Sequence, residues 1–280
     1  MSEGIPTACT TIEEVGSTGV GALTVAFLIL VVTTIVFLFK ANGSGEQRKY
    51  YYLSTYMCGF AAMAYFAMLS GQGWTAIAGC RQFFYARYAD WLVTTVLTVV
   101  LLGSVAGASG DVIGGAVGAD VIMIFAGYMG SVSVVTTVKW FWFLIGVMGL
   151  IGVVVHFAQT FKAAADSKGG DIATLYGKIA WVTILAWICY PVIWLFSEGF
   201  ASFSVSFEVC AYALVDIIAK VVMSFMVMSA HDLLGEGAQT REYAVAYLSH
   251  GELVFLSVLH GKHVNTYLAN KGVWFRLLVL

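Results

Sequence analysis

Charged residues are scarce in this chain. Asp, Glu, Lys and Arg make up only 11% of its 280 residues, whereas 60% are hydrophobic, and the mean hydropathy is +0.87. Because about a quarter of the residues in a typical soluble domain are charged, this composition excludes a soluble domain of this size. The net charge of -2 says nothing about partners by itself, and we expect no nucleic-acid partner.

Cysteine and proline are also rare. The five cysteines follow no metal-ligand or CxxC spacing, so we expect no metal site. Of only two prolines, Pro191 lies inside an apolar run. A proline within a helix removes one hydrogen bond, so a kink is predicted there.

Seven apolar runs are long enough to cross about 30 Å of hydrocarbon as helices. They are 18–39, 51–71, 83–107, 112–134, 140–160, 175–196 and 204–230. No short alternating strands, which are typical of a membrane barrel, occur among them. The sequence predicts an all-α membrane protein. A bundle of seven transmembrane helices would occupy residues 18–232, between an extracellular tail (1–17) and a cytoplasmic tail (233–280).

Positive charges are divided unevenly between the two sides of this bundle. On one side lie Lys40, Arg48, Lys49, Lys162, Lys168 and Lys178. The opposite side has mainly Arg81 and Lys139. The positive-inside rule therefore predicts a multi-pass protein of the cell membrane, with its N-terminus outside and its C-terminus in the cytoplasm. Cys9 and Cys80 would both lie outside, where a disulfide is permitted but not required.

The last apolar run contains two charges, Asp216 and Lys220. A charge deep in hydrocarbon costs about 3 kcal/mol on insertion scales, so an ionisable residue there indicates a functional site. The spacing of four places both residues on one helical face. Desolvation favours the neutral lysine amine, which condenses with an aldehyde to a Schiff base, and Asp216 could be its counter-ion. The alternative is an ion pair that only pins helices together.

A second group of charges lies in the third run. Arg87 and Asp90, with Thr94 and Leu101, project within one broad helical face. We expect that face to look at Lys220. Two carboxylates and two cations would then form a nearly neutral buried cluster, which is less costly than burying any one of them alone. A structural salt-bridge network is the alternative.

Aromatic residues in the sixth run share one face of the predicted helix. Trp187, Tyr190 and Trp194 lie on this face, beside Pro191. Such a stripe favours either a slot for a long, flat, apolar ligand or ordinary core packing.

Several buried polar residues also leave two interpretations open. Asp120 in the fourth run would be hydrogen-bonded to a neighbouring helix, and Tyr65 in the second would find a partner for its hydroxyl or simply pack. Glu198 and Glu208 would lie at the outer ends of the last two runs. There they would be solvated separately or would share a proton.

Three motifs resemble those of one known family. They are ARYADWLVTT in the third run, WICYPVIWL followed by SEG in the sixth, and LVD followed by AK in the seventh. In these motifs, and over about residues 18–234, the chain is similar to microbial (type 1) rhodopsins, nearest to bacteriorhodopsin-like proton pumps. The resemblance implies all-trans retinal bound to Lys220 as a protonated Schiff base. Asp90 would be the primary counter-ion and proton acceptor, and Asp216 the second counter-ion.

The resemblance also implies roles for neighbouring residues. Arg87 would gate the outer half, Tyr65 and Tyr190 would bond to Asp216, and Glu198 with Glu208 would release the proton outside. The expected retinal-binding residues, besides Lys220, are Tyr65, Trp91, Thr94, Thr98, Asp120, Met123, Gly127, Trp187, Tyr190, Pro191, Trp194 and Ala219.

One position departs from the pump pattern. Leu101 stands where proton pumps of this family carry a carboxylic donor, a departure that sensory members share. The paired glutamates and Ala219 match pumps, and Asp90 argues against a chloride pump. We therefore expect a light-driven outward proton pump with a slow photocycle, not an enzyme. Its surroundings would be the lipid bilayer, with homo-oligomers allowed. The alternatives are a photosensor that signals through a transducer partner and a light-gated cation channel.

Overall fold

The computed structural model describes residues 9–230, 234, 254–259 and 263–268. The chain divides into two units, Met1–His231 and Asp232–Leu280, which are considered separately. In the second unit, β3 (Val254–Leu259) pairs antiparallel with β4 (His263–Leu268). The other residues of the predicted tail 233–280, apart from Leu234, and the first eight of the predicted tail 1–17 lie outside the described residues.

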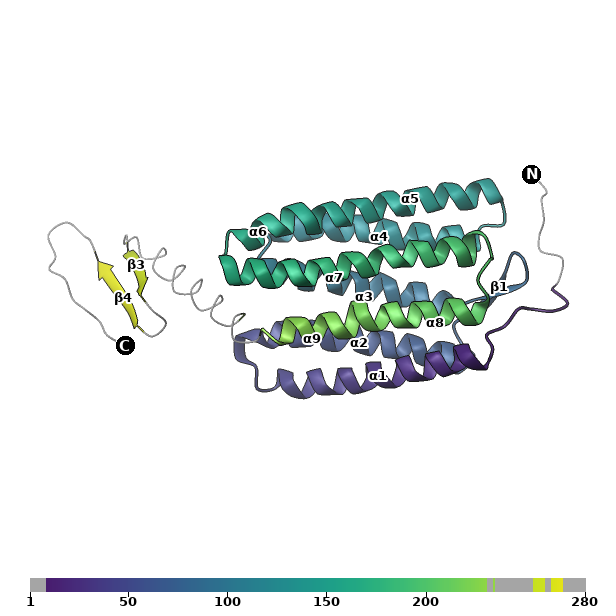
Figure 1. Cartoon of the computed structure of the whole chain (residues 1–280), viewed down its shortest axis with the longest axis horizontal. Helices are drawn as coiled ribbons and strands as arrows, with labels where there is room; N and C mark the ends of the chain where they lie inside the picture. The colour runs from purple at the N-terminus through teal and green to yellow at the C-terminus, as the bar shows by residue number, and fades with distance from the viewer. Residues whose placement is uncertain (1–8, 231–233, 235–253, 260–262, 269–280) are drawn as a thin grey trace. The chain divides into compact units, whose positions relative to one another are not determined.

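Long helices make up the first unit (Figure 1). They are α1 (Ser17–Ala41), α2 (Arg48–Leu69), α3 (Tyr85–Ala106), α4 (Gly110–Val132), α5 (Thr136–Val155), α7 (Gly170–Trp194) and α8 (Val205–Asp216). Shorter helical segments extend them: η1 (Gly45–Gln47) before α2, η2 (His156–Phe161) and α6 (Lys162–Asp166) after α5, η3 (Leu195–Gly199) after α7, and η4 (Ile217–Val222) with α9 (Met223–Met228) after α8.

The predicted seven-helix membrane bundle is confirmed. Within the described residues, seven continuous helices are long and apolar enough to cross a membrane. The fifth and sixth, Thr136–Asp166 and Gly170–Gly199, extend beyond the apolar runs that predicted them. Backbone hydrogen bonds continue a helix whether or not its side chains are apolar, so hydropathy alone underestimates helix length.

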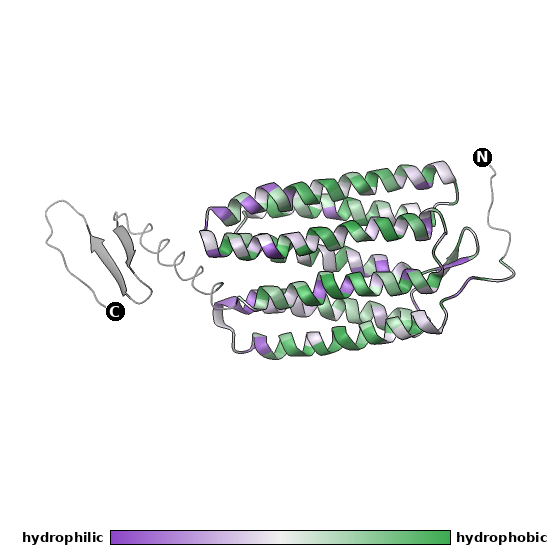
Figure 2. Ribbon diagram, in the orientation of Figure 1, coloured by the Kyte–Doolittle hydropathy of each residue, from purple (hydrophilic) through white to green (hydrophobic). Residues whose placement is uncertain are grey.

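The helices form a ring in which neighbours in sequence pack together. α1 packs on α2, α2 on α3, α3 on α4 and α4 on α5, and α8 returns to contact α1, while α3 also contacts α7. Apolar residues run along every helix, and hydrophilic ones gather mainly near the helix ends (Figure 2). Large apolar side chains such as Met148 are exposed on the outside, whereas the buried polar residues lie inside. This is the pattern expected of a bundle surrounded by lipid.

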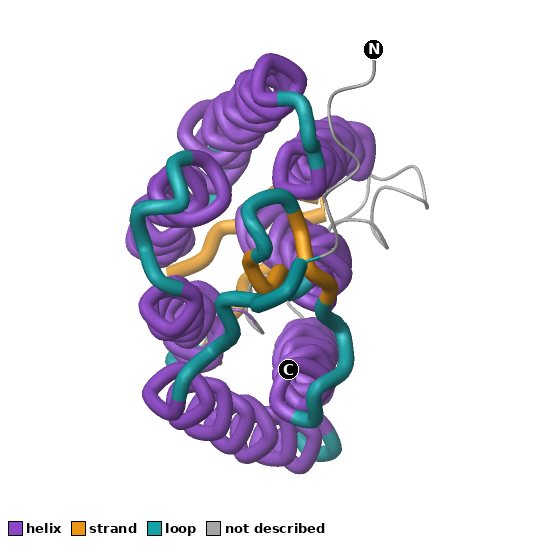
Figure 3. Tube along the Cα trace, turned by 90° about the vertical axis from the view of Figure 1, so that its right-hand side faces the viewer, coloured by secondary structure: helices purple, strands orange, loops and turns teal. Residues whose placement is uncertain are grey.

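A small hairpin connects α2 to α3 and covers one end of the bundle, called here the hairpin end (Figure 3). Its strands are β1 (Thr75–Ile77) and β2 (Arg81–Phe83). The turn between them needs positive φ at Gly79 and Cys80. Cys9 and Cys80 form a disulfide, which resolves a pairing that the sequence left open.

In the described part of the chain, three of the spanning helices contain π-helical segments: η2, η3 and η4. The last of these, η4, carries Lys220 and lies directly after Asp216. π-Helical insertions occur frequently at functional sites because they re-aim side chains that a regular α-helix would place differently.

Candidate functional site

The amine of Lys220 lies between two carboxylates at the centre of the bundle. Its Nζ donates to Oδ2 of Asp90 at 2.7 Å and to Oδ1 of Asp216 at 2.8 Å. Asp90 comes from α3, whereas Asp216 ends α8, one helical turn before the lysine. No more than 3% of any of the three residues is exposed. A buried cation is thereby balanced from two sides.

The two carboxylates differ in how firmly they are held. Asp216 accepts hydrogen bonds from the hydroxyls of Tyr65 (2.7 Å) and Tyr190 (2.6 Å) and from Nε1 of Trp91 (3.3 Å). Asp90 bonds to Lys220 through Oδ2 alone, and its Oδ1 has no partner among the described residues. Four donors therefore hold the Asp216 carboxylate in place, whereas one oxygen of Asp90 has no donor among the described residues.

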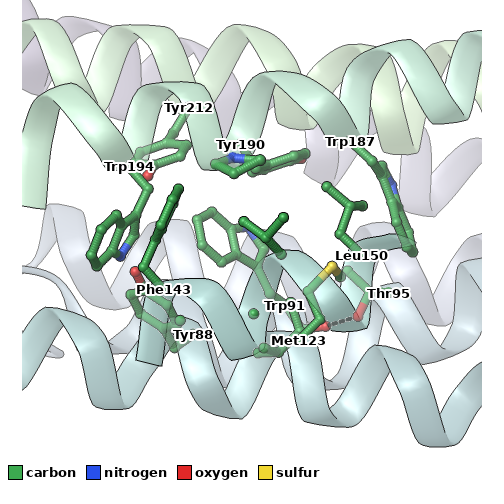
Figure 4. Close-up of a pocket in the computed structure, with 15 residues that line it drawn as sticks. Tyr88, Trp91, Thr95, Met123, Phe143, Leu150, Trp187, Tyr190, Trp194 and Tyr212 are labelled. Atoms are coloured by element: carbon green, nitrogen blue, oxygen red, sulfur yellow. Dashed lines mark hydrogen bonds between the residues drawn. The ribbon is translucent and has the colours of Figure 1, made fainter. Parts of the chain in front are cut away.

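An elongated apolar pocket lies beside this cluster (Figure 4). Trp194 and Phe143 lie at one end and Trp187 at the other, with Trp91 and Tyr190 facing each other across the middle. The lining residues are Tyr88, Trp91, Thr95, Met123, Ile124, Gly127, Phe143, Gly146, Val147, Leu150, Trp187, Tyr190, Pro191, Trp194 and Tyr212.

The pocket and the charge cluster share residues. Trp91 and Tyr190 line the pocket and also donate to Asp216, which is paired with Lys220. A long, flat, apolar aldehyde in this pocket would therefore lie next to a buried amine and a fixed carboxylate. This combination fits the retinal implied by the sequence motifs.

Other expected binding residues lie around the pocket rather than in its lining. The Thr95 hydroxyl, on the pocket wall, donates to Oδ2 of Asp120 at 2.7 Å, so Asp120 lies behind that wall. Thr94 and Thr98 are buried on α3 and bond to backbone oxygens one turn earlier. Tyr65 reaches the site through Asp216. The remaining one, Ala219, is buried in η4 beside Lys220.

A hydroxyl that the sequence did not single out organises one end of the pocket. Nε1 of Trp194 donates to Oγ of Ser131 at 2.7 Å, and the hydroxyl of Tyr88 bonds to the same atom at 2.8 Å. Ser131 comes from α4, so it ties α3 and α7 together. No local motif marks this serine, because its partners come from other helices.

At the hairpin end, Glu208 meets two arginines. Arg87 donates to its Oε1 at 2.5 Å and Arg81 to its Oε2 at 2.7 Å. Arg81, which the sequence places among the few positive charges of the hairpin side, is only 4% exposed. Glu198 is also buried, but neither of its carboxylate oxygens has a hydrogen-bond partner within the described part of the chain.

Leu101 lies on α3 toward the opposite end of the bundle from the hairpin. It is fully buried, eleven residues beyond Asp90. This corresponds to about 16 Å along the helix. Apolar and hydroxyl side chains, among them Thr98, occupy that part of α3.

Comparison with known proteins identifies the family to which this chain belongs. The family model described as bacteriorhodopsin-like protein matches residues 20–234. The chain belongs to this family. Archaerhodopsin-1 of Halorubrum ezzemoulense is 30% identical over 220 residues, which cover 76% of this chain and 85% of that protein. Bacteriorhodopsin of Halobacterium salinarum is 29% identical over 245 residues, covering 84% and 94%.

A solved structure agrees with this assignment. The light-driven proton pump rhodopsin of Coccomyxa subellipsoidea matches with a TM-score of 0.77 at 28% identity, covering 79% of this chain and 100% of that one. As a microbial rhodopsin, the chain is an integral multi-pass membrane protein. Its homologues include light-driven proton pumps.

Proposed function

We propose that this rhodopsin is a light-driven outward proton pump of the cell membrane that carries all-trans retinal on Lys220. The observation that carries the proposal is the position of the Lys220 amine between Asp90 and Asp216, beside the aromatic pocket. Retinal held there as a protonated Schiff base would supply light absorption and an isomerisation that changes the direction of the nitrogen–hydrogen bond.

In this proposal the two aspartates have different roles: Asp216 is a permanent counter-ion and Asp90 is the proton acceptor. Asp216, which accepts three hydrogen bonds besides that of Lys220, remains an anion and orients the Lys220 nitrogen. Asp90 takes the proton from that nitrogen, because its Oδ2 lies 2.7 Å away and its Oδ1 meets no competing donor in the described part of the chain. A general base must lie within hydrogen-bond reach of the proton that it removes, and Asp90 meets this requirement.

The direction of transport follows from the placement of the charges. With the N-terminus outside, the hairpin end faces the exterior, and the proton passes from Asp90 toward Arg87 and the acids beyond it. Arg87 lies over the ring of Tyr212, with 4.3 Å from its guanidinium carbon to the ring centroid, and pairs with Glu208. Arg87 thus separates Asp90 from the outer acids and would act as a gate.

Return of a proton from the cytoplasm is the slow step of the proposed cycle. Leu101 offers no carboxyl group, and the Thr98 hydroxyl cannot store a proton at neutral pH. The Lys220 nitrogen must therefore regain its proton from water that enters through the cytoplasmic half. This absence of a donor accounts for the slow photocycle that we propose.

The decisive experiment measures light-induced pH changes in cells or liposomes that contain the protein. An outward pump acidifies the medium of the cells, and a protonophore abolishes the change. Illumination without any sustained pH change, in a protein that still absorbs visible light, would contradict pumping.

A photosensor is the second candidate, and Leu101 is the observation that favours it. A sensor needs a long-lived light state but no internal donor, and it would act through a transducer partner. The same experiment separates the two candidates, because a sensor has a slow cycle without net transport.

A further inference from the structure

The guanidinium group of Arg81 bonds to three different acceptors, although the residue lies in a hairpin at the end of the bundle. Besides Glu208, it donates through Nη1 to Oε2 of Glu13 at 3.1 Å and to the backbone oxygen of Phe203 at 2.7 Å. Its side chain is 5% exposed. Arg81 is thus buried at the end of the bundle, next to the ion pair between Arg87 and Glu208.

The segment 9–16 holds Arg81 in this position. The backbone N–H of Glu13 donates to Cys80 at 2.8 Å, and that of Gln82 donates back to Glu13 at 3.0 Å. Glu13 also accepts from the backbone N–H of Val205, at the start of α8, at 3.1 Å. With the Cys9–Cys80 disulfide, this segment joins the hairpin to α8, the helix that carries Glu208.

These contacts restrict what Glu208 can do chemically. Each of its two oxygens accepts from a different guanidinium group. Guanidinium groups have donors only, so a hydroxyl on a protonated Glu208 would face a donor instead of an acceptor. Glu208 therefore serves as a fixed anion that balances Arg81 and Arg87.

Glu198 has the opposite surroundings. It is 97% buried in η3, yet its carboxylate accepts from no donor among the described residues. The nearby Lys139 donates to the backbone oxygen of Glu198 at 2.7 Å and not to its carboxylate. The charged groups that act on Glu198 are Glu208, Arg87, Arg81 and Lys139. A buried carboxyl without a direct ion pair favours its protonated form.

We propose that the two outer acids have separate roles, an inference that rests on the proposed pump function. Glu198 alone stores the proton that is released at the hairpin end. Glu208 stores none, because Arg81 locks it to Arg87 as a counter-ion, and Glu13 with the disulfide-linked segment positions Arg81. The family resemblance implies that Glu198 and Glu208 release the proton together, whereas this proposal gives the two acids different roles.

The test compares Glu198→Gln with the wild type in two measurements. Flash-induced proton release is followed with a pH-sensitive dye, and light-minus-dark infrared spectra detect a protonated carboxyl group. We expect Glu198→Gln to delay proton release by at least about tenfold and to lose the carboxyl band. Normal release and an unchanged band in this variant would overturn the proposal.

A second variant tests Arg81 itself and avoids removing Glu208, whose loss would take away the carboxylate that pairs with the buried Arg87. In Arg81→Gln/Glu198→Gln, one oxygen of Glu208 is freed, so we expect Glu208 to take up the proton. Compared with Glu198→Gln alone, the double variant should then regain both early proton release and an infrared carboxyl band. If the double variant keeps its visible band but regains neither early proton release nor a carboxyl band, Arg81 is not what prevents Glu208 from storing a proton.

Control variants separate this inference from the pump proposal. Glu14→Gln changes an exposed acid next to Glu13 and should leave both signals unchanged. If the wild type shows a photocycle with no net transport, the pump function fails. The infrared comparison still reports which acid carries the proton.

Discussion

The Nζ atom of Lys220 lies 2.7 Å from Oδ2 of Asp90, although 130 positions separate the two residues in the chain. The lysine comes from η4 and the aspartate from α3. The contact therefore exists only because the bundle brings side chains of the third and seventh spanning helices together in its interior. It gives the buried amine a second carboxylate, one that is less firmly held than Asp216.

The first prediction concerns the attachment site. Lys220→Ala should give a colourless protein that still inserts into the membrane, because among the described lysines only Lys220 has its amine between the two aspartates. Visible absorbance of the purified protein after addition of retinal measures this, and Lys178→Ala, an exposed lysine on α7, is the control that should keep its colour. A visible band in Lys220→Ala, without any added amine, would rule out the proposed linkage.

The second prediction separates the two carboxylates. Asp90→Asn should red-shift the visible band and abolish transport, because the cation loses its nearest negative charge and its proton acceptor. Asp216→Asn should instead destabilise the protein by about 1–3 kcal/mol, because the Tyr65 and Tyr190 hydroxyls lose a charged acceptor while Asp90 still balances Lys220. Absorbance spectra and thermal denaturation of both variants measure these effects. An unshifted, actively pumping Asp90→Asn protein would assign the acceptor role to Asp216.

The third prediction concerns the cytoplasmic half of α3. In the wild type, the time that the Lys220 nitrogen needs to regain its proton should lengthen as the pH rises, because the proton comes from bulk water. Leu101→Asp should shorten this time by at least about tenfold and weaken its pH dependence, since a carboxyl group then stores the proton. Flash absorption spectroscopy between acidic and alkaline pH measures both quantities.

Leu101→Asn is the matched control for this experiment. It has nearly the size and polarity of aspartate but cannot store a proton at neutral pH, so its recovery should remain slow and pH-dependent. Fast, pH-independent recovery in the wild type would show that another internal donor exists.

The fourth prediction concerns stability and needs no light. Thr95→Val should lower the free energy of unfolding by about 1–3 kcal/mol, because it leaves the buried Asp120 without its hydrogen-bond donor. Thermal denaturation measures the loss. Thr34→Val, where the hydroxyl bonds only to its own helix backbone, is the control and should change stability less. Equal losses in the two variants would show that the Thr95–Asp120 contact adds nothing specific.

Much of the fold could be predicted because its signals are local. A helix that crosses lipid must satisfy its own backbone, so a long apolar run is enough to identify it. The ends of the helices carry a weaker signal: the fifth spanning helix continues to Asp166, six residues beyond the predicted end. Polar residues past the hydrocarbon extend a helix without leaving a hydropathy signal.

The sequence by itself determined the seven spanning segments, the pairing of Asp216 with Lys220 and the shared face of Arg87 and Asp90. These follow from residue spacing within one helix and from the cost of charge in hydrocarbon. Only the tertiary structure decided that Arg81 is buried against Glu208, that Thr95 meets Asp120, and that the aromatic pocket adjoins the charge cluster. Each of these joins different elements, and such pairings depend on how the helices pack, which no single segment encodes.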